Sequence, residues 1–451
     1  MGQYRIERDS MGEVRVPADA LYGAQTARAV DNFPISGMRF TRPFLRALGL
    51  IKGASAAANE ELGQLPHDVA AAIEHACEEV IAGDHDDQFA VDVFQTGSGT
   101  STNMNANEVI ARIATGVLGA AVHPNDHVNR SQSSNDVIPA AIHVAAAEEI
   151  RRELLIAMLQ LAEAFKRKAA EFHDVIKIGR THLQDAVPMR MGQEFGGYAR
   201  QVEASVERIH CALDGIYELP LGGTAIGTGL NAPKGFGAAA IRILAERTRL
   251  PFREARNHFE AQAAKDAVAF LSGALKSYAL ALSKIANDLR WLGAIGEIKL
   301  PAVQPGSSIM PGKINPVIAE SVLMVCAQVV GYDATIAWCC ASGNFELNVM
   351  MPVMAHDLLH AIAILTAATR NFQARLVDGL EADRTRAAAF VEQSLAMATS
   401  LALEIGYDKA AALAKEAHET GRTIREVARE KSGIPEERLN ELLDPARQAG
   451  A

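Results

Sequence analysis

The feature that most restricts the fold of this chain is a set of long segments rich in alanine and leucine. The longest, Asn257–Leu292, spans about 36 residues without proline, and its single glycine is Gly273. Apolar residues recur along it three or four positions apart, as at Val268, Leu271 and Leu275, which is the helical period. At ~1.5 Å per residue, a helix of this length measures roughly 50 Å. The sequence therefore predicts one long, continuous helix here.

Four further segments predict helices of similar character, and no strand of any length is predicted between them. The segments are Asp136–Phe172, where Pro139 is tolerable only near the start, and residues 192–217, 316–341 and 350–378. Helices this long and apolar cannot all hide their apolar faces within one subunit. We therefore expect a mainly α fold with a central long-helix bundle that other copies of the chain complete.

The length and charge of the chain set its domain number and exclude one class of partner. With 451 residues, the chain exceeds the size at which a single core stops growing. We expect three domains: an N-terminal domain (1–134), a central helical bundle (135–385) and a small C-terminal helical domain (386–451). The net charge of −10 and the lack of a basic stripe exclude a dedicated nucleic-acid-binding protein.

Composition also predicts the cellular compartment. The most apolar window, Val322–Cys340, is interrupted by Gln328 and Asp333, so we expect a buried helix rather than a membrane span. The N-terminus is polar from its first residues, unlike a signal peptide. Five cysteines without paired spacing indicate reduced thiols, and together these features predict a cytoplasmic protein.

Three polar segments at the starts of predicted helices are candidates for anion binding. They are Gln95–Glu108, His123–Asp136 and Gly306–Asn315. A helix N-terminus presents unpaired N–H groups and partial positive charge, which suits an anion. Simple capping is the alternative, and Asn315 before Pro316 predicts such a cap. Each segment is, however, longer than a cap requires.

Familiar nucleotide and metal motifs do not fit these segments. Five residues separate Gly306 from Gly312, where a Walker A loop needs four, and Ile314 stands where that loop needs Ser or Thr. The segment GSGTST has no third glycine at dinucleotide spacing. Pro124 disfavours a helical metal pair of His123 and His127. We therefore expect neither a metal nor a cofactor.

One histidine stands apart from these segments. His182, in GRTHLQDAVP, lies in a short polar stretch between long helices, where polar residues often serve function. On the residues alone, a catalytic role and a solvated or hydrogen-bonded structural role both remain open.

Together these segments resemble the fumarase/aspartase superfamily. GSSIMPGKIN is similar to the superfamily signature, and the following segments resemble its companions in order and spacing: TGSGTSTNMN, HPNDHVNRSQSSND, GRTHLQDA, LGGTAIGTGLN and SGNFELNV. Within the superfamily the chain is more similar to class II fumarases than to aspartate ammonia-lyases. Ser98, Ser134 and Gly312 carry that distinction, because aspartases usually have Ala, Thr and Ala there.

The resemblance implies reversible hydration of fumarate to (S)-malate, without cofactor or metal. It implies that Ser307 is the base at C3 and that His182 and Glu320 handle the water molecule. The residues it implies for holding the substrate are Ser98, Gly99, Thr100, Ser133, Ser134, Asn135, Thr181, Ser308, Lys313, Ile314 and Asn315. It further implies a homotetramer whose active sites are shared between subunits, acting on C4 dicarboxylates and not on nucleic acid or membranes.

A second anion site is implied at His123, Pro124, Asn125 and Asp126, although Ala120 and Ala121 replace the basic residues usual before it. Two other departures from the superfamily pattern are a shortened loop at Trp291–Ile298 and the lack of Asn-Pro before Ile405.

Two alternatives to the fumarase function remain. One is aspartate ammonia-lyase or another C4-dicarboxylate lyase, and the other is a catalytically inactive, crystallin-like scaffold.

Overall fold

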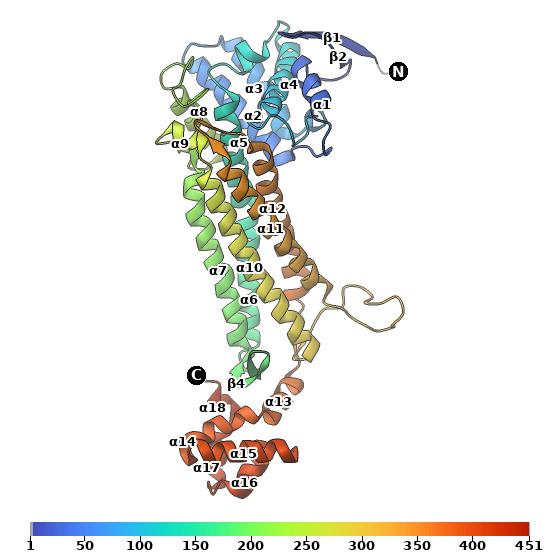
Figure 1. Ribbon diagram of the computed structural model, residues 1–451, viewed down its shortest axis with the longest axis vertical. Coiled ribbons are helices and arrows are strands. Elements are labelled where there is room, and N and C mark those ends of the chain that lie inside the picture. The colour runs from blue at the N-terminus through green and yellow to red at the C-terminus, as the bar shows by residue number, and fades with distance from the viewer. Residues whose placement is uncertain (1–2, 451) are drawn as a thin grey trace. The chain divides into compact units, whose positions relative to one another are not determined.

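The computed structural model describes residues 3–450 and is mainly α-helical, as predicted (Figure 1). The strands form only two-stranded sheets. Residue contacts group the chain into two compact units, which are described separately. Unit 1 contains the residues up to Ile156 together with Glu207–Ala279 and Ala327–Thr366. Unit 2 contains Ala157–Val206, Leu280–Cys326 and the residues from Ala367 onward.

Unit 1 is organised around α2 (Arg42–Glu61), which packs against α3 (His67–Ala82), α5 (Ser134–Glu149) and α8 (Phe236–Thr248). Its apolar face, with Leu45, Leu48 and Ile51, is almost fully buried. The other elements of unit 1 are β1 (Tyr4–Asp9), β2 (Gly12–Pro17), α1 (Ala24–Asn32), α3 (His67–Ala82), α4 (Thr100–Leu118), α5 (Ser134–Glu149), β5 (Glu218–Leu219), α8 (Phe236–Thr248), β6 (Arg253–Glu254), α9 (His258–Ala263), β8 (Gly343–Asn344) and β9 (Leu347–Asn348).

Unit 2 has an aromatic core between α6 (Leu155–Glu171) and the first part of α7 (Met191–Ile216). The ring of Phe165 lies 6.2 Å from Phe195 and 5.7 Å from Tyr198, and Phe372 also packs on it. The other elements are β3 (Ile176–Thr181), β4 (Gln184–Arg190), β7 (Ile298–Lys299), β10 (Glu381–Ala382), α13 (Arg384–Gln393), α14 (Ala402–Ile405), α15 (Tyr407–Thr420), α16 (Ile424–Lys431), α17 (Glu436–Leu442) and α18 (Pro445–Gln448).

Further long helices have segments in both units. They are α10 (Asp266–Ile295), α11 (Val317–Ala341) and α12 (Met351–Phe372), and α7 likewise crosses from unit 2 to unit 1 after Val206. Helix α11 matches the predicted range 316–341, and α12 with the π-helical turn Gln373–Val377 matches the range 350–378. The predicted helix from Asp136 to Phe172 is present as α5, a π-helical turn at Ile150–Leu154 and α6. Helix α7 confirms the prediction for 192–217.

The prediction of one continuous helix from Asn257 is wrong. The chain breaks at Ala264 and Lys265, between α9 and α10. The buried Lys265 ammonium donates to the carbonyls of Ala261, Gln262 and Ala264 at 2.7–2.9 Å. These bonds satisfy carbonyls that the end of α9 leaves unpaired, so the lysine stabilises a helix end within a helix-favouring sequence.

The most apolar helix is not buried within the chain, contrary to expectation. By length and composition, α10, α11 and Met351–Val377 could each cross a membrane. The most apolar window of α11 is only 28% buried, and Met324 and Trp338 are 68% and 73% exposed. The sequence pattern located the apolar helix correctly but could not show which of its faces the rest of the same chain covers.

Candidate active site

The first polar segment forms a tight turn that leads into α4. Gly99 occupies the position before the helix with φ +73°, a left-handed conformation that favours glycine. Gly97 lies against the backbone before α12: a Cβ atom there would stand 1.8 Å from the carbonyl oxygen of Val349. The turn therefore requires glycine at both positions, and it fixes Ser98 between them.

The second polar segment meets the first through its hydroxyl groups. Ser133 caps α5 by accepting a hydrogen bond from the Asn135 N–H at 3.2 Å. The Thr100 hydroxyl is hydrogen-bonded to Ser98 at 2.8 Å and to Ser134 at 2.7 Å. The structure thus brings together three of the predicted substrate-binding side chains at the N-termini of α4 and α5, where an anion is favoured.

The glycine-rich loop after β5 is fastened to the start of α5. Asp136 is fully buried and accepts hydrogen bonds from the N–H groups of Gly222 and Thr224 at 3.0 and 2.9 Å. Burial raises the pKa of Asp136 to about 6, although these N–H groups oppose the shift. The Asn135 amide donates to the carbonyl of Ala225 at 2.8 Å. A cavity of about 460 Å³ lies here, lined in part by Thr100, Ser133, Ser134, Thr224 and Asn231.

His182 lies in a β-hairpin that the sequence did not predict. Strands β3 and β4 pair in antiparallel fashion, with Thr181 opposite Gln184. The two residues of the turn, His182 and Leu183, have φ of +54° and +58° and are exposed. Two positive φ values match the twist of a hairpin, but they are unfavourable for residues other than glycine and asparagine. The turn therefore places His182 in an exposed position at the end of the hairpin, at a cost in backbone energy.

The third polar segment forms an exposed loop before α11. The Gly306 N–H donates to the carbonyl of Lys313 at 2.9 Å, and the Asn315 amide donates to the carbonyl of Gly306. Asn315 thus closes the loop instead of capping a helix as predicted, and α11 begins at Val317. A cavity of about 430 Å³, lined in part by Ser307, Lys313 and Ile314, lies within this loop.

Ser307 has an environment suited to negative charge on its oxygen. Its Oγ accepts hydrogen bonds from the N–H groups of Ile309 at 3.2 Å and Met310 at 3.0 Å. N–H donors directed at one oxygen stabilise its deprotonated form. Ser308 and Lys313 are exposed on the same loop, and Glu320 follows on the first turn of α11, 4.0 Å from Arg290.

Within unit 2, the loop of Ser307 and the hairpin of His182 remain separate. Among residues 3–450 no hydrogen bond or ion pair joins His182 to Ser307, Lys313 or Glu320. The predicted site residues therefore form three local groups, one around Thr100 and Ser134, one at the hairpin and one at the loop. Over the same residues, no group of three or more His, Cys, Asp or Glu side chains has metal-binding geometry.

The predicted second anion site is a short π-helical turn, Pro124–Val128, capped by His123. The Nδ1 atom of His123 accepts from the N–H groups of Asn125 and Asp126 at 3.3 and 3.1 Å. The Asp126 carboxylate lies 3.2 Å from the same nitrogen. Since Nδ1 is engaged within the turn, Nε2 is the ring nitrogen left for a ligand.

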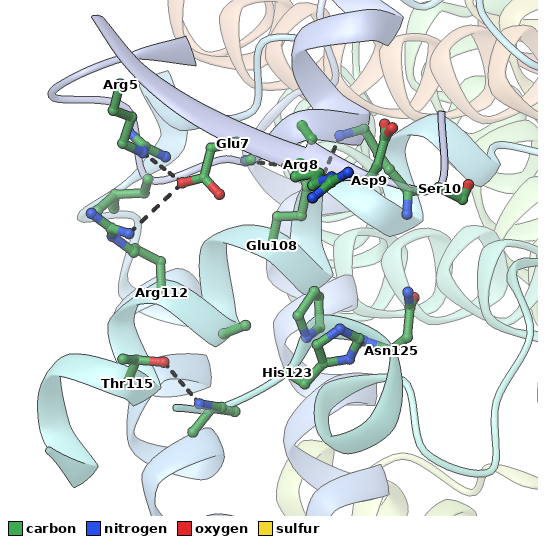
Figure 2. A pocket seen from close by; sticks show the side chains of 17 residues that line it. Arg5, Glu7, Arg8, Asp9, Ser10, Glu108, Arg112, Thr115, His123 and Asn125 are labelled. Carbon is green, nitrogen blue, oxygen red and sulfur yellow. Dashed lines mark hydrogen bonds and ion pairs between the residues drawn. The ribbon is translucent and has the colours of Figure 1, made fainter. Parts of the chain in front are cut away.

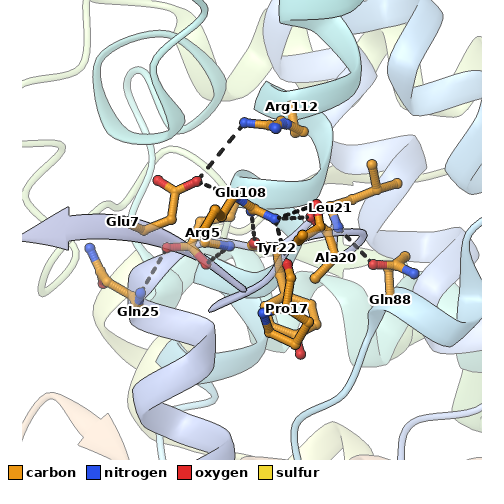
Figure 3. A network of polar contacts seen from close by, with 12 residues as sticks. Arg5, Glu7, Pro17, Ala20, Leu21, Tyr22, Gln25, Gln88, Glu108 and Arg112 are labelled. Atoms are coloured by element: carbon orange, nitrogen blue, oxygen red, sulfur yellow. Dashed lines mark hydrogen bonds and ion pairs between the residues drawn. The ribbon is translucent and has the colours of Figure 1, made fainter. Parts of the chain in front are cut away.

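This turn borders a cavity of about 550 Å³, which Figure 2 shows. Arg5, Arg8 and Arg112 line the cavity, with Glu7 and Glu108 among them. Arg5 donates to the carbonyls of Pro17, Ala20 and Tyr22, as Figure 3 shows, and is therefore structural. Arg8 and Arg112 remain as lining cations, and Arg112 lies 3.9 Å from Glu7. Asp9 also lines the cavity, so the three arginines are matched by the carboxylates of Glu7, Asp9 and Glu108, and Arg8 and Arg112 supply positive charge only locally, from β1 and α4.

One buried residue beside the site was missed from the sequence. Lys52 on α2 is fully buried and donates to side chains of the loop before Ser133. A detectable signal existed: Leu45, Leu48, Lys52, Ser55 and Asn59 share one helical face, and the last three are polar at positions expected to be apolar. Buried polar side chains in such a stripe need partners, and those partners belong to the site.

Comparisons with known proteins identify the family of the chain. Residues 12–331 match the family described as Lyase, and residues 397–447 match Fumarase C C-terminus. The class II fumarate hydratase of Mycobacterium tuberculosis (strain H37Rv) is 52% identical over 447 residues, which cover 98% of this chain and 94% of that protein. That of Halobacterium salinarum is 53% identical, with 98% and 96% covered.

Comparison with solved structures supports the same family. The class II fumarase of Schistosoma mansoni superposes with a TM-score of 0.97 at 39% identity, with 99% of both chains covered. A Brucella melitensis protein described as fumarate lyase:delta crystallin bound to cobalt gives a TM-score of 0.95 at 44% identity, with both chains fully covered. The family relationship predicted from the motifs is confirmed: the chain belongs to the class II fumarate hydratase family.

Proposed function

We propose that this protein catalyses the reversible hydration of fumarate to (S)-malate. The observation that carries the proposal is identity of about 50% to class II fumarate hydratases over nearly the whole chain. The local geometry supports it, because three polar groups at helix N-termini and loops suit a dicarboxylate. The reaction only adds or removes water, so it needs no external oxidant or reductant.

The difficult step in the dehydration direction is removal of the weakly acidic C3 proton of malate. Negative charge then develops on the adjacent carboxylate, which calls for donors arranged around it. We assign Ser307 as the base. A free serine is a poor base at neutral pH. The two N–H groups on its oxygen, with Lys313 on the same loop, supply the stabilisation that an alkoxide needs.

His182 and Glu320 are assigned to the water molecule that leaves C2. His182 is exposed at the tip of its hairpin, and Glu320 is partly exposed at the start of α11, so both are available to a substrate. In hydration the same pair would activate water, because the forward and reverse reactions share one transition state.

The substrate carboxylates are assigned to hydroxyl, amide and ammonium groups. Their donors are Ser98, Gly99, Thr100, Ser133, Ser134 and Asn135 from the N-termini of α4 and α5, Thr181 from the hairpin, and Ser308, Lys313, Ile314 and Asn315 from the loop before α11. We also assign a second dicarboxylate site to the turn His123–Asp126, with Arg8 and Arg112 supplying charge in the adjoining cavity.

The assembly we propose is a homotetramer in which three copies of the chain contribute to each active site. The exposed apolar surface of α11 supports it, since Met324 and Trp338 need a cover. We propose that other copies of the chain, and not a lipid bilayer, contact the apolar surfaces of the three helices α10, α11 and α12. All five cysteines are free thiols, which supports a cytoplasmic location.

The decisive experiment measures fumarate by its ultraviolet absorbance after malate or aspartate is supplied as the only substrate. We expect rapid fumarate formation from malate and negligible formation from aspartate. Comparable or faster turnover of aspartate would assign the protein to the ammonia-lyases. Turnover of neither substrate would favour an inactive scaffold.

A further inference from the structure

The buried Lys52 on α2 contacts the loop that leads into the candidate dicarboxylate site. Its side chain is fully buried, and its ammonium donates to Asn129 Oδ1 and Gln132 Oε1, each at 2.9 Å. Among residues 3–450 no carboxylate lies within ion-pair distance of it. A buried lysine without a carboxylate partner is costly for folding, so we looked for a role that offsets this cost.

The two acceptors of Lys52 organise the turn immediately before Ser133. The Asn129 amide donates to the carbonyl of Gln132 at 3.2 Å. The Gln132 amide donates to the carbonyls of Val128 and Arg130, both at 3.0 Å. Lys52 therefore fixes both ends of the turn at once. The next residues along the chain are Ser133, Ser134 and Asn135, the proposed carboxylate donors.

A neutral side chain on the same face of α2 holds the same turn. The Asn59 amide donates to the carbonyl of Arg130 at 3.0 Å, and its Oδ1 accepts from the hydroxyl of Ser131 at 2.7 Å. Asn59 is also fully buried. The turn is thus held by one ionisable residue, Lys52, and one neutral residue, Asn59. Replacing each in turn therefore distinguishes the effect of charge from the effect of anchoring the turn.

The charged and titratable groups around Lys52 leave its protonation sensitive to an anion bound nearby. Burial lowers its pKa to about 7, and the Asp136 carboxylate on α5 partly opposes the shift. From α3 it faces Cys77, whose thiol pKa is raised by burial, so that the thiol stays neutral. Helix α8 brings Arg247 close to Gly53, but Glu74 at 2.7 Å and Glu78 at 3.1 Å pair with that guanidinium.

We propose that Lys52 is a positioning residue for the dicarboxylate site, which orders the Asn129–Gln132 turn and becomes fully protonated when a dianion binds beside it. The inference rests on the proposed function of Ser133–Asn135. Burial favours the neutral amine of Lys52 in the free protein. An arriving dicarboxylate favours the ammonium, so binding takes a proton from solvent, and the ammonium in turn holds the loop against the ligand.

The first test compares Lys52→Met with Asn59→Leu, which removes the neutral anchor and changes no charge. Malate kinetics are measured from about pH 6 to about pH 9, where malate is dianionic. We expect Lys52→Met to raise KM for malate about tenfold or more with kcat within about threefold, because the proposed base and acid lie on other segments. The wild-type KM should rise at least about threefold from pH 7 to pH 9, and this rise should disappear in Lys52→Met. Asn59→Leu should raise KM and keep the wild-type pH dependence.

The second test needs no variant that might fail to fold. Titration calorimetry of the wild type with an equilibrium mixture of malate and fumarate, in two buffers of different ionisation enthalpy near pH 7.5, reports proton uptake on binding. We expect a clear fraction of a proton per site. No uptake overturns the proposal, and so does a Lys52→Met variant with wild-type KM at every pH. A wild type that does not turn malate over at all contradicts the proposed function itself, and Lys52's role with it.

Discussion

The guanidinium of Arg180 donates to the carboxylate of Glu297 at 2.9 Å, and the Glu297 side chain is completely buried. Lys177 lies 3.3 Å from the same carboxylate and 2.8 Å from Glu194. A register shift between Ile178 and Arg180 in β3 puts Lys177 and Arg180 on one face of the hairpin. A buried charge cluster thus lies under β3, the strand that precedes His182, and Glu297 itself belongs to the shortened segment Trp291–Ile298, two residues after the end of α10 at Ile295.

Replacing Glu297 should destabilise unit 2 strongly. In Glu297→Gln, the buried Lys177 and the partly buried Arg180 lose a shared buried carboxylate, which costs about 3–5 kcal/mol of unfolding free energy. Urea denaturation measures the loss. The matched control is Asp185→Asn, which removes the 46% exposed carboxylate on the other side of Arg180 and should cost less than about 1 kcal/mol. Equal losses of unfolding free energy in the two variants would mean that the buried Glu297 stabilises the fold no more than the exposed Asp185 does.

Gly97 should be intolerant of any side chain, because the space is filled by backbone. In Gly97→Ala the new Cβ would stand 1.8 Å from the Val349 carbonyl oxygen, so the turn with Ser98 and Thr100 must shift. We expect kcat/KM for malate to fall at least about tenfold, roughly 1.4 kcal/mol of transition-state binding. The control is Gly116→Ala on α4, where nothing lies within 4 Å and alanine should stabilise the helix by about 0.5–1 kcal/mol. Wild-type kinetics in Gly97→Ala would show that the turn is not part of the site.

The helices and the polar segments were largely predictable from the sequence, since both depend on local patterns. Apolar residues three or four apart gave α7, α11 and α12 nearly to their ends. Runs of hydroxyl and amide residues located the starts of α4 and α5, although only α5 has a side-chain cap, Ser133, and α4 follows Gly99. The break at Lys265 was missed, because alanine-rich flanks favour a helix and only the lysine's three bonds to carbonyls reveal the end.

The parts that could not be predicted depend on contacts distant in sequence. Nothing in GRTHLQ marks a two-residue hairpin turn, because neither His182 nor Leu183 favours positive φ. The hairpin exists because β3 packs against α13, more than two hundred residues later. The contact between Thr100 and Ser134 likewise depends on the packing of α4 against α5. Which face of α11 the rest of the chain leaves exposed likewise depends on packing distant in sequence.

Lys313 should be essential for activity and dispensable for folding. It is exposed, and no ion pair to it occurs among residues 3–450. Lys313→Met should leave the urea midpoint unchanged, while kcat/KM for malate falls by the roughly 2–5 kcal/mol that an unpaired dianion costs. Lys299→Met is the control, because this 63% exposed lysine precedes the loop and faces Asp383 instead. Retention of more than about a tenth of wild-type kcat/KM would exclude Lys313 as a substrate ligand.

The relative damage from Ser307→Ala and His182→Asn tests which residue is the carbanion-forming base. Asparagine tolerates the positive φ of position 182, so that variant should keep the hairpin intact. We expect the serine change to lower kcat more, because it removes the oxygen to which two N–H groups are directed. Steady-state kinetics on malate, with deuterium at C3 to report proton abstraction, measures the order. The reverse order would give the role of base to His182.

The same two variants test the proposed sharing of sites between copies. If His182 and Ser307 of one active site come from different chains, two inactive variants can restore each other. His182→Asn and Ser307→Ala chains are unfolded, mixed equally and reassembled. Each site then receives wild-type His182 with a chance of one half and wild-type Ser307 with a chance of one half, so about a quarter of the sites should be complete. Activity should return to about that fraction of the wild type, from two preparations that are each nearly inactive.

Distinct affinity tags on the two variants show whether the chains have mixed. Mixed assemblies without recovered activity would mean that each site is built within a single chain.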